Sequence, residues 1–259
     1  PRTVAAGGGM VVEWALLASL AEADSENPLP FEIARPTGFA DLDQGGRAVV
    51  YPDLPGRDLP LHELTGGPGL SAHLGASLAA LHEIDTEIVA DTIPVYSAQE
   101  CRTRLLAELD LMAQTGRIAP EVLRRWEEAL EDVRAWRFRP TFVHGDLAPE
   151  RVLTDRDRVL AITDFTAAHV GDPAVDLAWL IAAAPEEAVE SVLEAYAYHR
   201  GERAEQMVLA RAQLLSELAL GRWLLHGLRI GDALVTDEAE AMLADLAIAV
   251  DGAAPIVTG

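Results

Sequence analysis

Two aspartates, Asp146 and Asp164, stand where short apolar β-type runs end. Asp146 lies in the loop after residues 141–143, and Asp164 closely follows the run at 159–162. In phosphoryl transfer, one carboxylate orients the attacking hydroxyl and accepts its proton, and a second holds Mg²⁺ against the phosphates. Short loops at strand ends can fix both carboxylates accurately. Either aspartate alone is better explained as a polar residue at a turn, but the two in this order indicate a catalytic pair.

The segment around these aspartates resembles a known superfamily. HGDLAPERVL at 144–153, followed by ITDFTAAHVGDPAVDLAW at 162–179, matches the pattern of the aminoglycoside phosphotransferase-like kinases. Weaker similarity, spread over most of residues 10–250, is greatest to the macrolide 2′-phosphotransferases. It is carried by residues 79–82, 96–99, 125–126 with Trp136, and 217–221.

The resemblance implies a role for each matching residue. Asp146 would be the catalytic base and Asp164 the Mg²⁺ ligand. His144 would brace the catalytic loop, and Asp176 would anchor that loop from the following helix. The implied nucleotide-binding residues are the hinge Tyr51, Pro52, Asp53 and Leu54, whose backbone would contact the purine, and the apolar floor Leu153 and Ile162. The nucleotide would be GTP, as in similar macrolide kinases, or ATP, as in many relatives.

Arg151 departs from the superfamily pattern. Relatives have Asn at this position, or His in the macrolide group, to coordinate metal. Arginine has five donors and no lone pair to offer a cation. It could instead contact a phosphate bidentately and replace a second metal with its own charge. The alternative is a degenerate site that binds nucleotide or ligand without turnover.

The start of the chain is a second departure. The superfamily has a Gly-rich hairpin and a cationic residue before its first helix, and neither precedes Glu13 here. We interpret Gly7–Gly9 as a flexible connection, because no strand precedes it and the chain has no lysine. Glu13 would then be the helix glutamate whose cationic partner is missing, or an ordinary exposed carboxylate. The chain begins at Pro1, and we expect the natural protein to continue upstream.

The elements that position these residues follow from periodicity and capping signals. Residues 10–20 have helical spacing, 31–33 and 47–51 are strand-like, and 52–56 forms a linker. Further helices are predicted from Ser97 to Met112, from Pro120, from the N-cap Asp172 to about Ala184, and at 186–199, 204–230 and 237–250, the last opened by Asp237 and Glu240. This order predicts an α+β fold. With the resemblance, it implies a protein-kinase-like two-lobe fold. A curtailed N-terminal nucleotide-binding lobe at 1–55 would end in the hinge, and a mainly helical lobe would occupy 56–259.

Composition narrows the possible partners. The 259 residues carry 20 basic and 42 acidic side chains, a net charge of −22, which argues against nucleic-acid binding through a basic face. A cationic small substrate would suit such a field, although solubility alone also explains it. A single cysteine, Cys101, and no apolar run long enough to span a bilayer favour a cytoplasmic protein without membrane attachment. We expect a monomer.

The acceptor is the least determined part of the prediction. Trp179, Tyr196, Tyr198, Trp223 and Leu224 could give the late helices an apolar acceptor groove, although core packing explains each of them as well. An apolar groove would favour a macrolide, and a dense cluster of carboxylates would favour an aminoglycoside. A small-metabolite alcohol remains an alternative. The other histidines, His82 among them, lack metal-ligand spacing and are expected to be ordinary core or surface residues.

Overall fold

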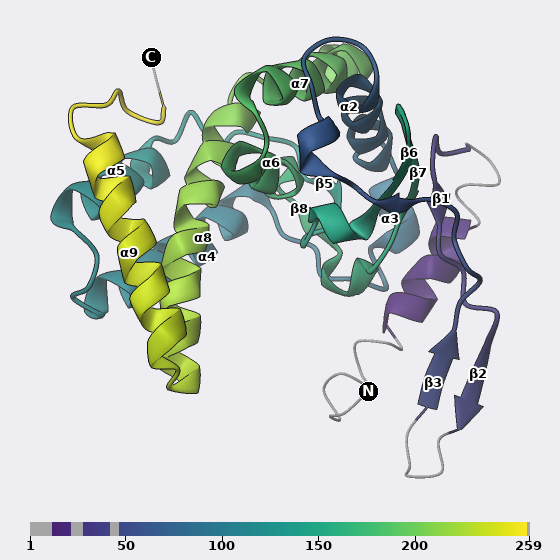
Figure 1. Cartoon of the computed structure of the whole chain (residues 1–259), viewed down its shortest axis with the longest axis horizontal. Helices are drawn as coiled ribbons and strands as arrows, with labels where there is room; N and C mark the ends of the chain where they lie inside the picture. The colour runs from purple at the N-terminus through teal and green to yellow at the C-terminus, as the bar shows by residue number, and fades with distance from the viewer. Residues whose placement is uncertain (1–11, 22–27, 42–46, 258–259) are drawn as a thin grey trace.

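The computed structural model describes residues 12–21, 28–41 and 47–257. Gly7–Gly9 lies outside these ranges. Figure 1 shows a small part, built from the first helix and short strands, beside a larger helical part that ends in two long helices. Within the described ranges, no helix is both long and apolar enough to cross a bilayer.

The main sheet joins the two predicted lobes. Its strand order is β1 (Glu32–Ile33), β7 (Arg158–Ile162), β6 (Val152–Asp155), β4 (Arg57–Asp58). β6 and β7 form an antiparallel hairpin, whereas β1 pairs with β7 in parallel. Because β1 belongs to the predicted first lobe and β7 to the second, the sheet crosses the boundary proposed near residue 55.

Two smaller strand pairs flank this sheet. β2 (Gly38–Asp41) and β3 (Arg47–Val50) form an antiparallel hairpin that extends away from the rest of the small part in Figure 1. β5 (Thr141–Val143) pairs antiparallel with β8 (His169–Gly171). β5 ends shortly before Asp146, and β8 begins shortly after Asp164.

Helices make up most of the remainder. They are α2 (Leu70–Leu81), α3 (Thr86–Val89), α4 (Ala98–Gln114), α5 (Pro120–Glu131), α6 (Ala178–Ala183), α7 (Glu186–Arg200), α8 (Val208–Ile230) and α9 (Ala233–Val250). Short 3₁₀ turns lie at η1 (Leu61–Glu63), η2 (Pro149–Arg151), η3 (Phe165–Ala167), η4 (Pro173–Asp176) and η5 (Gly201–Arg203). The first helix spans residues 12–21.

Most predicted helix starts are confirmed. Ser97 and Glu100 form the capping box of α4, and Pro120 is the first residue of α5. Asp172 caps the turn η4, and the predicted helix to Ala184 is divided into η4 and α6. The predicted start of the last helix was wrong. Asp232 caps α9 directly after α8 ends, so α9 begins at Ala233 rather than near 237.

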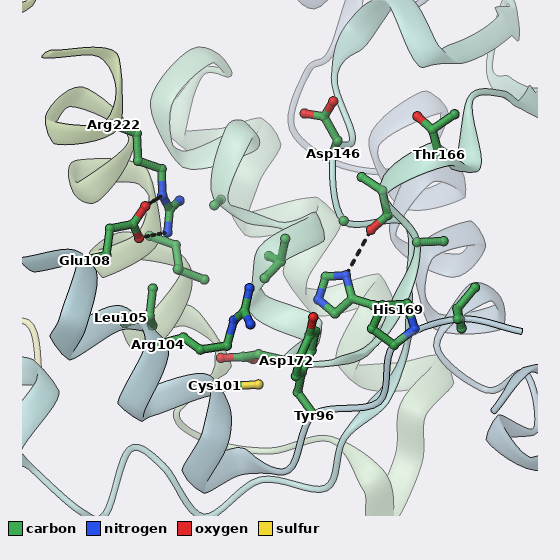
Figure 2. A pocket seen from close by; sticks show the side chains of 18 of the residues that line it. Tyr96, Cys101, Arg104, Leu105, Glu108, Asp146, Thr166, His169, Asp172 and Arg222 are labelled. Carbon is green, nitrogen blue, oxygen red and sulfur yellow. Dashed lines mark hydrogen bonds and ion pairs between the residues drawn. The ribbon is translucent and has the colours of Figure 1, made fainter. Parts of the chain in front are cut away.

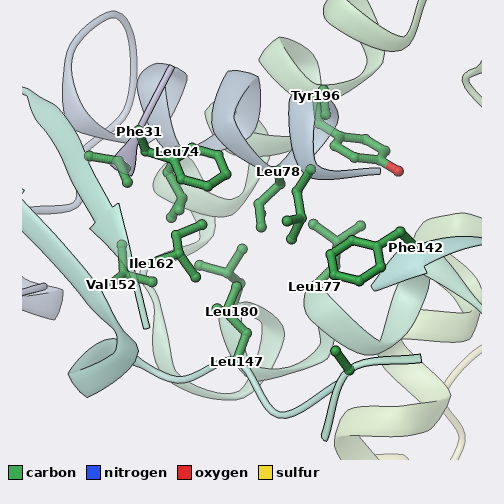
Figure 3. Packing of buried hydrophobic residues seen from close by; sticks show 14 of the residues in the cluster. Phe31, Leu74, Leu78, Phe142, Leu147, Val152, Ile162, Leu177, Leu180 and Tyr196 are labelled. Carbon is green, nitrogen blue, oxygen red and sulfur yellow. The ribbon is translucent and has the colours of Figure 1, made fainter. Parts of the chain in front are cut away.

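Two clusters of buried hydrophobic side chains form the core of the described part of the chain. One joins α2, α6 and α7 to the sheet and contains Leu74, Leu78 and Ile162 (Figure 3). The other lies among α4, α5, α8 and α9 around Trp126. α2 and α7 pack so closely that a Cβ at Gly75 would overlap the backbone of α7. Burial of the apolar side chains in these two clusters is the main contribution to the stability of the elements that carry Asp146 and Asp164.

Candidate active site

A fully buried carboxylate fixes the loop that carries Asp146. The backbone N–H groups of His144 and Gly145 donate to Asp176 at 2.7 and 2.8 Å, and the Nε2 of His82 contacts the same carboxylate at 3.1 Å. Burial alone would raise the pKa of Asp176, but its bond to His82, the neighbouring His144 and the Gly145 N–H hold that pKa below its ordinary value. The loop therefore has a rigid, charged anchor.

His144 connects the two catalytic segments. Its buried ring bonds through Nε2 to the carbonyl of Thr163 at 2.8 Å, and its Nδ1 accepts the backbone N–H of Asp146 at 3.3 Å. The next residue, Gly145, has φ of 84°, and a Cβ there would overlap the carbonyl of Ala167. These contacts explain why the sequence has histidine and then glycine before Asp146.

Arg151 lies between the two aspartates. Its Nη1 is 2.5 Å from Asp146 Oδ2, and its Nε is 3.1 Å from Asp164 Oδ2. The same Nη1 also donates to the backbone carbonyl of Asp146. The side chains of Asp146 and Asp164 are 61% and 42% exposed, whereas Arg151 is 22% exposed. The guanidinium thus bridges the two carboxylates that the sequence predicted as base and metal ligand, and it offsets part of their negative charge.

Asp164 has donors on both carboxylate oxygens. Oδ1 accepts the hydroxyl of Thr166 at 2.6 Å, and Oδ2 accepts Arg151. Burial acts to raise the pKa of Asp164, but the Thr166 hydrogen bond and the Arg151 charge bring it below the ordinary value. No cluster of three or more His, Cys, Asp or Glu side chains that could hold a metal occurs in the described part of the chain. The single carboxylate of Asp164 is compatible with Mg²⁺, because Mg²⁺ in nucleotide sites takes most of its other ligands from substrate phosphates and water.

A cleft of about 560 Å³ adjoins Asp164 on one side. Its lining includes most of the predicted nucleotide-binding residues: Glu13, Tyr51, Pro52, Asp53, Leu54 and Leu153. Ile162 does not line it, because this side chain is fully buried in the first hydrophobic cluster beneath. The hinge segment and Asp164 therefore face one space.

Glu13 has partners that the sequence did not predict. Its carboxylate accepts the backbone N–H of Phe165 at 3.1 Å, and it is hydrogen-bonded to Tyr51. Burial raises its pKa above the ordinary value, with the Phe165 hydrogen bond opposing the shift. The first helix is thus tied to the residue after Asp164 through a carboxylate.

A second cleft of about 1330 Å³ adjoins Asp146. Tyr96, which lies just before α4, lines it with Arg104 and Glu108 of α4 and Arg222 of α8 (Figure 2). Phe165 lines both clefts. Asp146 therefore faces the larger cleft and Asp164 the smaller one, and Arg151 joins the two carboxylates.

Comparison with known families agrees with this geometry. A family model described as the phosphotransferase enzyme family matches residues 13–214. The chain belongs to this family. Its structural relatives support a phosphotransferase with a hydroxyl group as acceptor, and they confirm the predicted kinase-like α+β fold.

Several solved structures resemble this phosphotransferase. The macrolide 2′-phosphotransferase MphH from Brachybacterium faecium, solved as the apoenzyme, is 29% identical, with a TM-score of 0.78 over 94% of this chain and 82% of MphH. A macrolide 2′-phosphotransferase type I is 23% identical, with a TM-score of 0.76 over 94% and 81% of the two chains. The complex of APH(2″)-IIIa with GDP and kanamycin is 20% identical, with a TM-score of 0.78 over 95% and 84%. The last two show the fold alone.

A sequence relative covers less of the chain. The uncharacterized protein YcbJ of Bacillus subtilis (strain 168) is 31% identical over 80 residues. The match spans 30% of this phosphotransferase and 26% of YcbJ. This chain therefore matches about a quarter of the length of that curated relative.

The predicted aromatic groove is not where this phosphotransferase places its larger cleft. Tyr196 is buried and bonded to His82 at 2.8 Å, and Tyr198 is 82% exposed. Trp179 donates to the backbone of Asp176, and Trp223 stacks on His226. Leu224 is fully buried in the second hydrophobic cluster. None of these five described side chains lines the cleft at Asp146.

Sequence reasoning missed several residues that the fold brings to the site. Tyr96 and Arg104 line the same cleft as Asp146, a neighbourhood that no local pattern indicates. His82, expected to be ordinary, contacts the anchor Asp176. The segments at 79–82 and 96–99 had contributed to the family resemblance, and that similarity was the only signal available for His82 and Tyr96.

Proposed function

We propose that this chain transfers the γ-phosphoryl group of a purine nucleoside triphosphate to a hydroxyl of a macrolide antibiotic. The observation that carries the proposal is the placement of two aspartates on connected loops at the boundary of two clefts. Asp146 lines the larger cleft and Asp164 the smaller one. A nucleotide in the smaller cleft and an acceptor in the larger one would meet between these carboxylates.

The roles of the two aspartates follow from that placement. Asp146 accepts the proton of the acceptor hydroxyl while the hydroxyl oxygen forms a bond to the γ-phosphorus. The bond from that phosphorus to the β,γ-bridging oxygen breaks, and the nucleoside diphosphate leaves with its electron pair. Asp164 holds Mg²⁺, which supplies charge neutralisation at the phosphates when bound. His144 and Asp176 keep the two loops in register.

Arg151 has two functions in this scheme. In the nucleotide-free state it offsets the mutual repulsion of Asp146 and Asp164. With Mg²⁺ held by Asp164, Arg151 would keep its pair with Asp146, and its released Nε would supply part of the charge that relatives obtain from a second metal. The enzyme then works with one metal, held by Asp164.

The lining of the larger cleft supports a macrolide over an aminoglycoside. Its three carboxylates each have an arginine partner, so little negative charge remains for a polycation: Glu108 pairs with Arg222, Asp146 with Arg151, and Asp172 with Arg211. Apolar residues from several elements form much of the remaining wall, including Ile93, Leu105, Leu111, Val175 and Leu215. A large, mainly apolar acceptor suits such a surface.

Product analysis by mass spectrometry tests this function. The chain is incubated with Mg²⁺, ATP or GTP, and a panel of macrolides and aminoglycosides. We expect one added phosphoryl group on a macrolide, and a loss of about 10²- to 10⁴-fold in rate for Asp146→Asn. Asp155→Asn is the matched control, because Asp155 is an exposed aspartate at the end of β6.

Two other results would redirect the assignment. Phosphorylated kanamycin without macrolide product would favour an aminoglycoside kinase. Metal-dependent nucleotide binding with no product on any acceptor would favour a binding protein that has lost turnover, with Arg151 as the residue responsible. An unchanged rate in Asp146→Asn would refute the role of this aspartate as base.

A further inference from the structure

The larger cleft contains a stacked arginine away from the catalytic carboxylates. The guanidinium carbon of Arg104 lies 4.5 Å from the ring centroid of Tyr96. Both residues line the cleft that contains Asp146. Figure 2 shows Arg104 directed into the space between His169 and the Glu108–Arg222 pair. This arrangement presents a flat cationic surface to whatever fills the cleft.

The platform under Arg104 is held firmly. The backbone N–H of Tyr96 donates to the carbonyl of Val170 at 2.8 Å, which ties it to β8. The ring of His169 packs edge-on against Tyr96, with centroids 5.6 Å apart. Arg104 itself rises from the second turn of α4, directly after the capping box. Stacking on an anchored ring restricts the guanidinium, so less freedom is lost when it forms a hydrogen bond.

Arg104 differs from the other charged side chains of the cleft, which are held in ion pairs. Every Asp and Glu lining the cleft has an arginine partner, and Arg222 pairs with Glu108 at 2.8 Å. Within the described part of the chain, Arg104 forms no ion pair with a carboxylate. Its in-plane N–H donors are therefore free to bind an incoming oxygen.

We propose that Arg104 determines acceptor specificity by donating to a carbonyl oxygen on the apolar body of the acceptor. The proposal rests on the function proposed above. It adds that a carbonyl-bearing face of the acceptor lies at the Arg104 end of the larger cleft. A lactone or ketone oxygen satisfies the guanidinium, whereas an ammonium group placed there is repelled. The acceptor's amine must therefore lie elsewhere, and a polycationic aminoglycoside is disfavoured.

Direct binding measurements test the inference without requiring turnover. Isothermal titration of the nucleotide-free chain is carried out with erythromycin, a macrolide lactone, and with kanamycin. We expect Arg104→Gln to weaken erythromycin binding by about 10- to 100-fold, the usual range for one charge-assisted hydrogen bond. Arg104→Glu should weaken erythromycin binding at least as much and tighten kanamycin binding. Arg124→Gln, an exposed arginine of α5, is the control.

A second variant separates the stack from the charge. Tyr96→Leu removes the platform and leaves the arginine, and we expect a smaller loss of erythromycin affinity than in Arg104→Gln. Equal erythromycin affinity in the parent and Arg104→Gln overturns the proposal, and so does a parent that binds neither drug. Erythromycin binding that depends on Arg104 without phosphorylated product supports the inference while refuting the proposed function.

Discussion

Replacing Arg151 by Asn is expected to raise the metal affinity of the nucleotide-free site. The guanidinium forms ion pairs with Asp146 and Asp164 at 2.5 and 3.1 Å, and a metal must displace the second of these to reach Asp164. Both carboxylates are well exposed, so each pair is discounted for solvent screening to about 0.5–1 kcal/mol. Removing the Asp164 pair, which is the one that the metal must displace, gives about 0.5–1 kcal/mol, or about 2- to 5-fold tighter metal binding.

Manganese binding, followed by electron paramagnetic resonance, measures this effect without catalysis. Arg156→Asn is the matched control, because Arg156 lies in the exposed turn between β6 and β7. The variants of Arg151 should also differ in activity. Arg151→Ala should be slower than the parent, since it loses the cation near the phosphates. Arg151→Asn or Arg151→His should retain or exceed parental activity, since each supplies a metal ligand.

Three results would refute the assigned role of Arg151. One is an unchanged manganese affinity in Arg151→Asn. Another is an equal gain in Arg156→Asn, which would indicate a general effect of charge. The third is equal activity of the alanine, asparagine and histidine variants and the parent, which would show that the guanidinium does not act on the transferring group.

Two further predictions concern the scaffold. Gly75→Ala should lower Tm, because a Cβ there overlaps the backbone of Val192, and such overpacking costs about 1–3 kcal/mol. Gly221→Ala is the matched helical control, because its Cβ meets the flexible side chain of Met112; equal Tm changes would contradict the argument. Asp176→Asn should cost about 2–4 kcal/mol at pH 7 in urea unfolding. The pKa of Asp176 in the folded protein lies below its ordinary 3.8, so the difference in unfolding free energy between the parent and Asp176→Asn should shrink only as the pH falls below 3.8. A difference that already narrows between pH 7 and pH 5 would refute this prediction.

Local sequence patterns predicted the strands on either side of the two aspartates well. The strands at 141–143 and 152–162, and the capping box at Ser97, depend on residues close together in the chain. Residues 51–54 also line one cleft with Asp164, and their role as a hinge that contacts the purine stays a prediction. These features share short-range causes, namely alternation, turn chemistry and caps, which a sequence displays directly.

Features that depend on long-range packing were not predictable. Tyr196 and Trp179 have the apolar character of a ligand groove, but that character also suits a core, and the structure uses them around Asp176. Arg104 is unremarkable in sequence, and only the approach of α4 to the catalytic loop places it in the cleft. The double contact of Arg151 depends on a side-chain conformation that sequence does not specify.

Under the proposed function, the negative charge of the smaller cleft explains why a metal and Arg151 would both be needed. It is lined by four carboxylates, Glu13, Asp53, Asp58 and Asp164, and by Arg57, which is already paired with Glu63 at 2.6 Å. A triphosphate entering this space meets like charge unless cations accompany it. Mg²⁺ carried by the nucleotide would satisfy Asp164, and this releases Arg151 from that carboxylate. The same event then brings a second positive charge to the phosphates, so nucleotide binding itself would convert an internal ion pair into part of the phosphoryl-transfer site.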